Sequence, residues 1–109
     1  MSQELIVLIT APSAEEAARI AEAIVSERLA ACVNIVGGVT SIYRWQGEVT
    51  RDNETLMMVK TTAARYEELE QRVKALHSYT TPEVIALRIE CGSADYLNWL
   101  GQSVARDGE

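Results

Sequence analysis

The first apolar stretch of the chain is a run of five aliphatic residues, Leu5 to Ile9. An unbroken run of β-branched residues and leucine predicts a central strand that is covered on at least one face. Ser13 and Glu16 then have the spacing of a capping box, in which each side chain satisfies a free N–H group at the start of a helix. That helix is predicted to be amphipathic, because apolar residues recur every three or four positions at Ala17, Ile20, Ala21 and Ile24.

A long hairpin is predicted next. Strand-like residues run from 31 to 45, and Gly37-Gly38 in the middle indicates a bulge or sharp bend because the strand pattern resumes at Val39. Residues 46–53 are polar and include Gly47, which predicts the turn of the hairpin. Residues 54–61 are the expected returning strand.

The remaining pattern repeats the order of helix and strand. Thr62 is a predicted N-cap, and the helix after it has an apolar stripe at Tyr66, Leu69, Val73 and Leu76. Residues 84–90 alternate as a fourth strand, with one face formed by Ile85, Leu87 and Ile89. A short C-terminal helix is expected after Gly92-Ser93.

The predicted order is therefore βαββαβ followed by a short helix. Two βα units with right-handed crossovers, joined by a hairpin, give a four-stranded antiparallel sheet with both main helices on one face. This is the α+β ferredoxin-like sandwich. No repeat, linker or shift in composition divides the chain, so we expect a single domain over residues 1–109.

The hairpin formed by the second and third strands is too long for one small sheet. Its first strand has about twice the usual length of a strand, and the part beyond Gly38 still carries Val39, Ile42, Tyr43 and Trp45. An open apolar strand edge pairs readily with another chain. We therefore expect each copy to extend its hairpin into a neighbour's sheet in a homo-oligomer. The alternative is a monomer with a flexible projecting hairpin.

Charge and cysteine content limit the partners and the compartment. The net charge is −6, from 10 Lys and Arg against 16 Asp and Glu. This argues against nucleic acid, which needs clustered cations, and suits a metal ion or cationic ligand better. The N-terminal apolar run is too short for a signal sequence or a membrane span. We expect a cytoplasmic protein without a membrane partner, in which Cys32 and Cys91 are buried thiols.

Several short segments, taken together, carry a family resemblance: Thr10–Pro12, Leu29–Asn34, Ser41–Trp45, Lys60–Thr62, His77–Glu83 and Asp95–Trp99. In order and spacing they resemble the CutA divalent-cation-tolerance proteins from about residue 5 to residue 100. The resemblance implies a homotrimer of ferredoxin-like protomers, similar in architecture to the PII signalling proteins. It also implies a role in tolerance to copper and other divalent cations.

The resemblance further implies a copper site made by a cysteine at the end of the first strand and by histidines in a His-Pro-Tyr loop. In this chain the strand position is Ile9, the residue before His77 is Leu76, and the loop proline is replaced by Ser78. We therefore expect only weak binding of Cu²⁺ or another divalent cation, through His77 and carboxylates. The alternative is a loop histidine that interacts favourably with the dipole of the preceding helix.

Cys32 is a second and weaker candidate for a metal ligand. No residue beside it in the sequence favours the thiolate form, and a structural thiol is the alternative. The spacing of Cys32, His77 and Cys91 matches no zinc motif.

Five residues match family positions that line a cleft between subunits: Tyr43, Trp45, Lys60, Tyr79 and Glu83. A cleft with an ammonium group, a carboxylate and aromatic walls would suit a small anionic or zwitterionic ligand. The alternative is that these residues hold the oligomer together, since Trp and Tyr are enriched at interface cores and Lys60 with Glu83 could form an ion pair.

Signatures of enzymes are absent from the sequence: it has no Gly-rich phosphate loop, no nucleophile elbow and no HExxH motif. We therefore expect a protein that is not an enzyme. The first interpretation is a CutA-like trimer involved in the response to metal ions. The second is a PII-like small-molecule sensor or adaptor, and the third is a hydrolase or transferase that uses Lys60 and Glu83 as acid and base.

Overall fold

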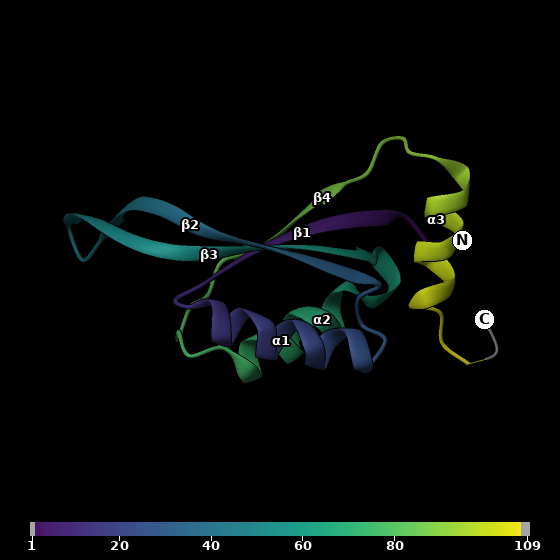
Figure 1. The fold of residues 1–109 in the computed structure, drawn as a ribbon, viewed down its shortest axis with the longest axis horizontal. Helices are drawn as coiled ribbons and strands as arrows, with labels where there is room; N and C mark the ends of the chain where they lie inside the picture. Colours follow the sequence, from purple (N-terminus) through teal and green to yellow (C-terminus); the bar gives the residue numbers. More distant parts are fainter. Residues whose placement is uncertain (1, 108–109) are drawn as a thin grey trace.

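The computed structural model describes residues 2–107. In chain order, the elements are β1 (Glu4–Ala11), α1 (Ala14–Ser26), β2 (Cys32–Trp45), β3 (Glu48–Thr62), α2 (Ala63–Leu76), β4 (Val84–Arg88) and α3 (Ala94–Ser103). Helices α1 and α2 cover one face of the sheet, while α3 lies at the end of the sheet away from the hairpin tip (Figure 1). The prediction of element order is confirmed.

The sheet is antiparallel, with the strand order β2-β3-β1-β4 that defines the ferredoxin-like arrangement. In the centre of the sheet, Val7 pairs with Val59 on one side and with Ala86 on the other. The core lies between the sheet and the two helices and is formed mainly by Val7, Ile9, Met57, Val59, Ile20, Ile24, Leu69 and Val73. Removal of these side chains from water, at roughly 1.5–3 kcal/mol each, drives the formation of this sandwich.

At the N-terminus of both α1 and α2, one predicted capping contact is not formed. Ser13 caps α1, because its Oγ accepts a hydrogen bond from the backbone N–H of Glu16 at 3.1 Å. The reciprocal half of the capping box is wrong: the Glu16 carboxylate instead accepts hydrogen bonds from Ser78. Thr62 occupies the N-cap position of α2, but its side chain makes no capping hydrogen bond.

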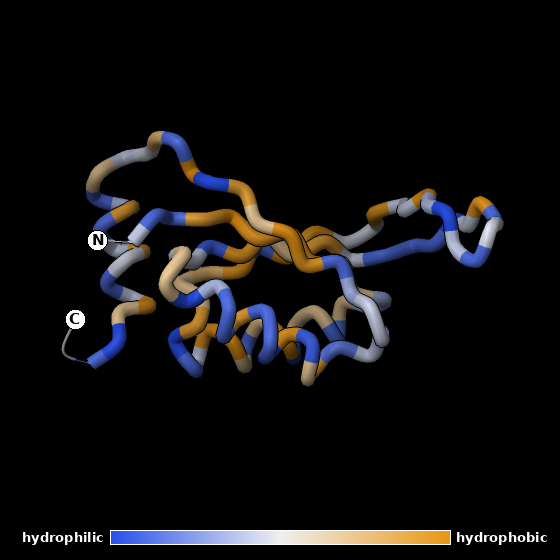
Figure 2. Tube along the Cα trace, turned by 180° about the vertical axis from the view of Figure 1, so that it is seen from behind, coloured by the Kyte–Doolittle hydropathy of each residue, from blue (hydrophilic) through white to orange (hydrophobic). Residues whose placement is uncertain are grey.

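The hairpin is longer than predicted. Only Gln46-Gly47 separates β2 from β3, and Trp45 pairs with Glu48 directly beside this turn. The turn therefore lies within the predicted segment 46–53, but the predicted start of the third strand at residue 54 is wrong, because polar residues 48–53 are part of β3. This outer part projects from the body, and the molecule measures 47 × 27 × 22 Å (Figure 1). Hydrophobic residues dominate the centre of the sheet, whereas the outer hairpin is mixed (Figure 2).

A β-bulge lies where the glycine pair predicted it. The pairing of β2 with β3 changes register between Val36 and Val39. Gly38 has a φ of +73°, which is a left-handed backbone conformation that glycine adopts without a steric penalty. The bulge therefore marks the point at which the hairpin leaves the body of the protein.

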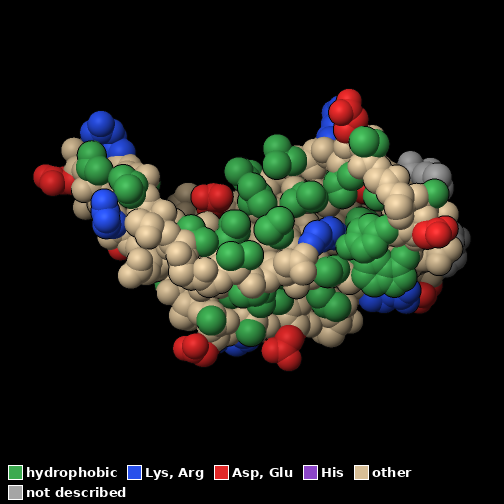
Figure 3. All heavy atoms as spheres, turned by 45° about the horizontal axis from the view of Figure 1, so that its top comes forward, with side chains coloured by type: hydrophobic (Ala, Val, Ile, Leu, Met, Phe, Trp, Pro, Cys, Tyr) green, Lys and Arg blue, Asp and Glu red, His purple; other side chains and the backbone are tan. Residues whose placement is uncertain are grey.

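The face of the sheet opposite α1 and α2 is largely uncovered. Ile6 pairs with Leu87, and Leu8 pairs with Ile85, so these four side chains share this face. In the single chain, Ile85 and Leu87 are 52% and 57% exposed. Figure 3 looks towards this side and shows hydrophobic side chains spread between the hairpin and α3.

The fourth strand ends two residues earlier than predicted, at Arg88. Its last pair joins Leu5 to Arg88, and little of β1 remains beyond that point to pair with. Cys91 therefore lies outside the strand and is exposed, which corrects the prediction that it is buried. Cys32, at the start of β2, is half-buried.

Candidate functional site

A cavity of about 630 Å³ lies where the hairpin joins the body. Its walls come from the end of β1, the outer parts of β2 and β3, and the loop between α2 and β4. The lining residues are Thr10, Ser41, Ile42, Tyr43, Trp45, Asp52, Glu54, Tyr79, Thr80, Thr81 and Glu83. Four of the five predicted cleft residues (Tyr43, Trp45, Tyr79 and Glu83) therefore lie in the same cavity.

Lys60, the fifth predicted cleft residue, does not line this cavity. It pairs with Ile6 of β1 and with Cys32 of β2, near the other end of the sheet. Its Nζ donates a hydrogen bond to Oδ1 of Asn34. The expected combination of Lys60 and Glu83 in one cavity is therefore not found within a single chain.

Two tyrosine hydroxyls in the cavity donate hydrogen bonds to carboxylates. Tyr43 bonds to Asp52, and the Tyr79 hydroxyl lies 3.0 Å from Oε2 of Glu54. Burial, together with this bond to Glu54, raises the pKa of Tyr79 to about 12. The bond to Asp52 likewise raises the pKa of Tyr43 above its ordinary value. Both hydroxyls therefore stay protonated near neutral pH and act as donors.

His77 is buried next to the cavity, and backbone groups occupy both of its ring nitrogens. Nε2 lies 2.7 Å from the carbonyl oxygen of Thr10, and Nδ1 accepts a hydrogen bond from the backbone N–H of Tyr79 at 3.0 Å. These partners assign the neutral tautomer with the proton on Nε2. The ring also packs against the ring of Tyr79 at 4.8 Å between centroids. A metal ion could bind His77 only by displacing one of these contacts.

Glu16 holds this loop from the side of α1. Its Oε2 accepts hydrogen bonds from the backbone N–H and the Oγ of Ser78, at 2.9 Å and 3.0 Å, and lies 3.4 Å from Nδ1 of His77. Burial of the carboxylate raises its pKa, but the bonds from Ser78 and the nearby charge of Arg19 outweigh burial and lower it. The sequence indicated Glu16 only as a capping residue.

The residues present do not fit the copper site that the family resemblance implies. Ile9 offers no ligand, and His77 already has a partner at each ring nitrogen. Cys32 lies at the Lys60 end of the sheet, whereas His77 contacts Thr10 at the other end of β1. Within residues 2–107, no group of three or more His, Cys, Asp or Glu side chains could hold a metal ion.

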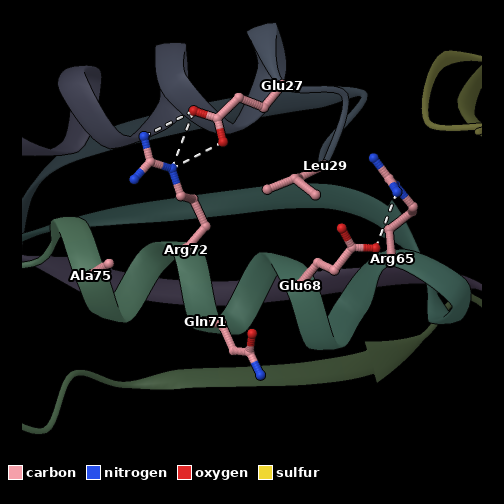
Figure 4. A pocket seen from close by; sticks show the side chains of 7 residues that line it. All are labelled: Glu27, Leu29, Arg65, Glu68, Gln71, Arg72 and Ala75. Atoms are coloured by element: carbon pink, nitrogen blue, oxygen red, sulfur yellow. Dashed lines mark hydrogen bonds and ion pairs between the residues drawn. The ribbon is translucent and has the colours of Figure 1, made fainter.

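A second cavity, of about 410 Å³, lies between the end of α1 and α2, and its charges are paired (Figure 4). Arg72 forms a two-pronged ion pair with Glu27, with N–O distances of 2.9 Å and 3.0 Å. Arg65 lies 3.1 Å from Glu68 and also donates to the carbonyl of Arg28. The ion pair of Arg72 with Glu27 links α2 to the end of α1. Each charged side chain in this cavity already has an opposite charge beside it, which leaves no unpaired charge for a ligand.

Together, the fold and the main cavity define an α+β protein of ferredoxin-like topology with an aromatic and carboxylate-lined cleft beside a projecting hairpin. The CutA1 divalent ion tolerance protein family matches residues 5–103. The chain therefore belongs to the CutA1 family of divalent ion tolerance proteins.

Individual relatives agree with this assignment. The divalent-cation tolerance protein CutA of Thermus thermophilus is 60% identical over 100 residues, which cover 92% of this chain and 97% of that protein. A solved structure of the Thermus thermophilus protein has a TM-score of 0.92 at 59% identity and covers 94% of this chain and 99% of the other. A crystal structure of CutA1 from Oryza sativa has a TM-score of 0.93 at 44% identity, with 97% of each chain covered.

Names of relatives place them in different compartments. The curated rice protein CutA 1, chloroplastic, is 48% identical over 91% of this chain, and the match spans only 56% of that protein. A structure from Archaeoglobus fulgidus, described as periplasmic, has a TM-score of 0.91 at 42% identity, covering 94% of this chain and 99% of the other. Among the described residues of the present chain, no helix is both long and apolar enough to cross a membrane.

Proposed function

We propose that this chain is a homotrimeric, single-domain divalent-cation-tolerance protein that takes part in the response to metal ions. The tolerance role is supported by the family to which the chain belongs. The observation that carries the proposed assembly is the hairpin that projects from the body (Figure 1). In the single chain, Ile42, Trp45 and Val49 are 60%, 57% and 72% exposed. A group of large exposed apolar side chains usually marks an interaction site, and a second copy of the same chain is the simplest partner that could cover it.

The free edges of the sheet support assembly by strand pairing. The strand order β2-β3-β1-β4 leaves β2 and β4 with one unpaired side each. β2 is an edge strand along its whole length of 14 residues, so the backbone hydrogen-bonding groups on its outer side have no partner in their own sheet. We propose that the outer part of β2 pairs with an edge in a neighbouring copy. The number three comes from the family resemblance.

Size-exclusion chromatography with light scattering tests the assembly. The expected mass is three times the 12.0 kDa of one chain. A stable species with the mass of one chain at micromolar concentration would refute the assembly.

For metal ions, we propose weak binding of Cu²⁺ or another divalent cation, with His77 and then Cys32 as candidate ligands in the assembled protein. Titration calorimetry with Cu²⁺ should compare the wild type with His77→Ala and Cys32→Ser, and with Cys91→Ser as the control for an exposed thiol. Loss of binding in His77→Ala alone supports that residue. Unchanged binding in both variants removes both candidates and leaves surface carboxylates.

Growth of cells at increasing Cu²⁺ concentration tests the biological role. Cells that express the chain should tolerate more Cu²⁺ than matched cells that do not. The family match favours this role over that of a PII-like sensor or adaptor.

We further propose that the protein is cytoplasmic and is not an enzyme. Both cysteine thiols are free, which suits a reducing compartment. The only histidine of the sequence has backbone partners at both ring nitrogens, so it is not available as a general base. Cell fractionation tests the location. Four residues stay candidates for a ligand site in the cleft: Tyr43, Trp45, Tyr79 and Glu83.

A further inference from the structure

The cavity of about 630 Å³ beside the hairpin is lined by negative charges and by no positively charged residue. Three carboxylates line it (Asp52, Glu54 and Glu83), and its lining contains no Lys, Arg or His. None of the three carboxylates takes part in an ion pair within residues 2–107. The cavity between α1 and α2 differs in this respect, because its two arginines are each paired with a glutamate.

Glu54 is the most informative of the three carboxylates. Glu54 is only 8% exposed, and its Oε2 accepts a hydrogen bond from the neutral hydroxyl of Tyr79. A charge that is taken out of water is unfavourable unless an opposite charge or several hydrogen bonds compensate for it. One hydroxyl supplies only part of that compensation, so a cation in the cavity would further stabilise the Glu54 carboxylate.

The walls of the cavity determine which kind of cation fits. Tyr43, Trp45 and Tyr79 place three aromatic rings in the lining, and aromatic faces attract organic cations by the cation–π interaction. A volume of about 630 Å³ is far larger than a bare metal ion needs. The described residues also lack the group of three ligating side chains that would hold a metal ion.

We propose that this cavity binds a small organic ammonium ion, with Glu54, Asp52 and Glu83 as counter-charges and the aromatic rings as walls. The inference rests on the proposed function in taking the cleft as a ligand site, and it names the class of ligand. It differs from the anionic or zwitterionic ligand expected for a cleft between subunits, because Lys60 does not line this cavity of the single chain. A ligand carboxylate would meet like charges in this cavity.

Calorimetric titration of the intact protein with choline chloride tests the class of ligand. The matched probe is 3,3-dimethylbutan-1-ol, which has the same shape without the charge. We expect choline to bind at least about tenfold more tightly than the alcohol, since a desolvated cation–π contact and a counter-charge both depend on the cation. Sodium acetate, as the small anion, should give no heat of binding.

Two variants locate the site, and a third is the control. Glu54→Gln should weaken choline binding about tenfold or more and leave binding of the alcohol unchanged. Glu83→Gln, at an exposed position, should weaken it in the same direction and remains informative if Glu54→Gln fails to fold. Glu67→Gln makes the same change of charge on an exposed position of α2, outside the cavity, and should have no effect.

Several outcomes would overturn the proposal. Equal affinity for choline and the alcohol would make the cavity an apolar site, and stoichiometric displacement of choline by MgCl₂ would make it a metal site. Absence of choline binding to a protein that light scattering shows to be trimeric would overturn the ligand class while leaving the proposed assembly intact. Choline binding by a sample that light scattering shows to be monomeric would support the ligand class and refute the assembly.

Discussion

Replacement of Glu16 by glutamine should destabilise the protein by about 2 kcal/mol at neutral pH. The carboxylate accepts two hydrogen bonds from Ser78, at 2.9 Å and 3.0 Å. A hydrogen bond to a charged group contributes about 1.5–3 kcal/mol, against about 0.5–1.5 kcal/mol for a neutral pair. Glutamine keeps an acceptor oxygen and the shape of the side chain, so the loss is about 1 kcal/mol for each of the two bonds.

The effect of pH on this variant has a definite sign. The folded state lowers the pKa of Glu16 below its ordinary value of 4.5. The carboxylate therefore contributes stability that is fully present above the unfolded-state pKa and is lost as pH falls through the folded-state pKa. The difference between wild type and Glu16→Gln should be constant near neutral pH and should shrink progressively below about pH 4.5.

Urea unfolding at one fixed protein concentration measures this difference, because the stability of an assembly depends on concentration. Glu15→Gln is the matched control, since it makes the same change one position earlier, at an exposed position of α1. It should change the free energy of unfolding by less than about 0.5 kcal/mol. Equal losses in the two variants, or a difference that grows on acidification, would refute the account of Glu16.

Three further predictions concern local structure and assembly. Ser13→Ala should lower stability by about 1 kcal/mol in thermal unfolding, whereas Thr62→Ala should cost clearly less because Thr62 makes no capping bond. Gly38→Ala should lower stability by about 1 kcal/mol because of its φ of +73°, while Gly37→Ala should not; equal effects would contradict the assigned bulge. Trp45→Ala should weaken self-association by at least about 2 kcal/mol in sedimentation equilibrium, and unchanged association would exclude Trp45 as an interface anchor.

The fold could be predicted wherever the pattern along the chain is local. The helical stripe through Ile20 and Ile24 faces the core, as predicted. In the aliphatic run from Leu5 to Ile9, Val7 and Ile9 also face the core, whereas Ile6 and Leu8 lie on the uncovered face of the sheet. The outer hairpin could not be predicted in this way. Residues 48–53 form a strand without a buried core face in the single chain, so their polar composition is indistinguishable from that of a turn.

The candidate site shows the same division between local and long-range information. Tyr43, Trp45, Tyr79 and Glu83 meet in one cavity of the single chain, and the cleft between subunits that the family positions imply stays a prediction. Lys60 does not line this cavity, because its place is set by the register of β3 against β1 and β2, which no spacing along the sequence specifies. Glu16 was predicted as half of a capping box, but Ser78, 62 positions away, provides the stronger competing donors.

The loop that carries Tyr79 is tied down on several sides. The Tyr79 hydroxyl bonds to β3, its backbone N–H bonds to His77, and the neighbouring Ser78 bonds to α1. This wall of the cavity is thus preorganised, and a guest molecule loses little affinity to the ordering of the loop. Recognition should then resemble lock-and-key binding, with the same loop geometry before and after a guest arrives and no slow closing step in the association kinetics.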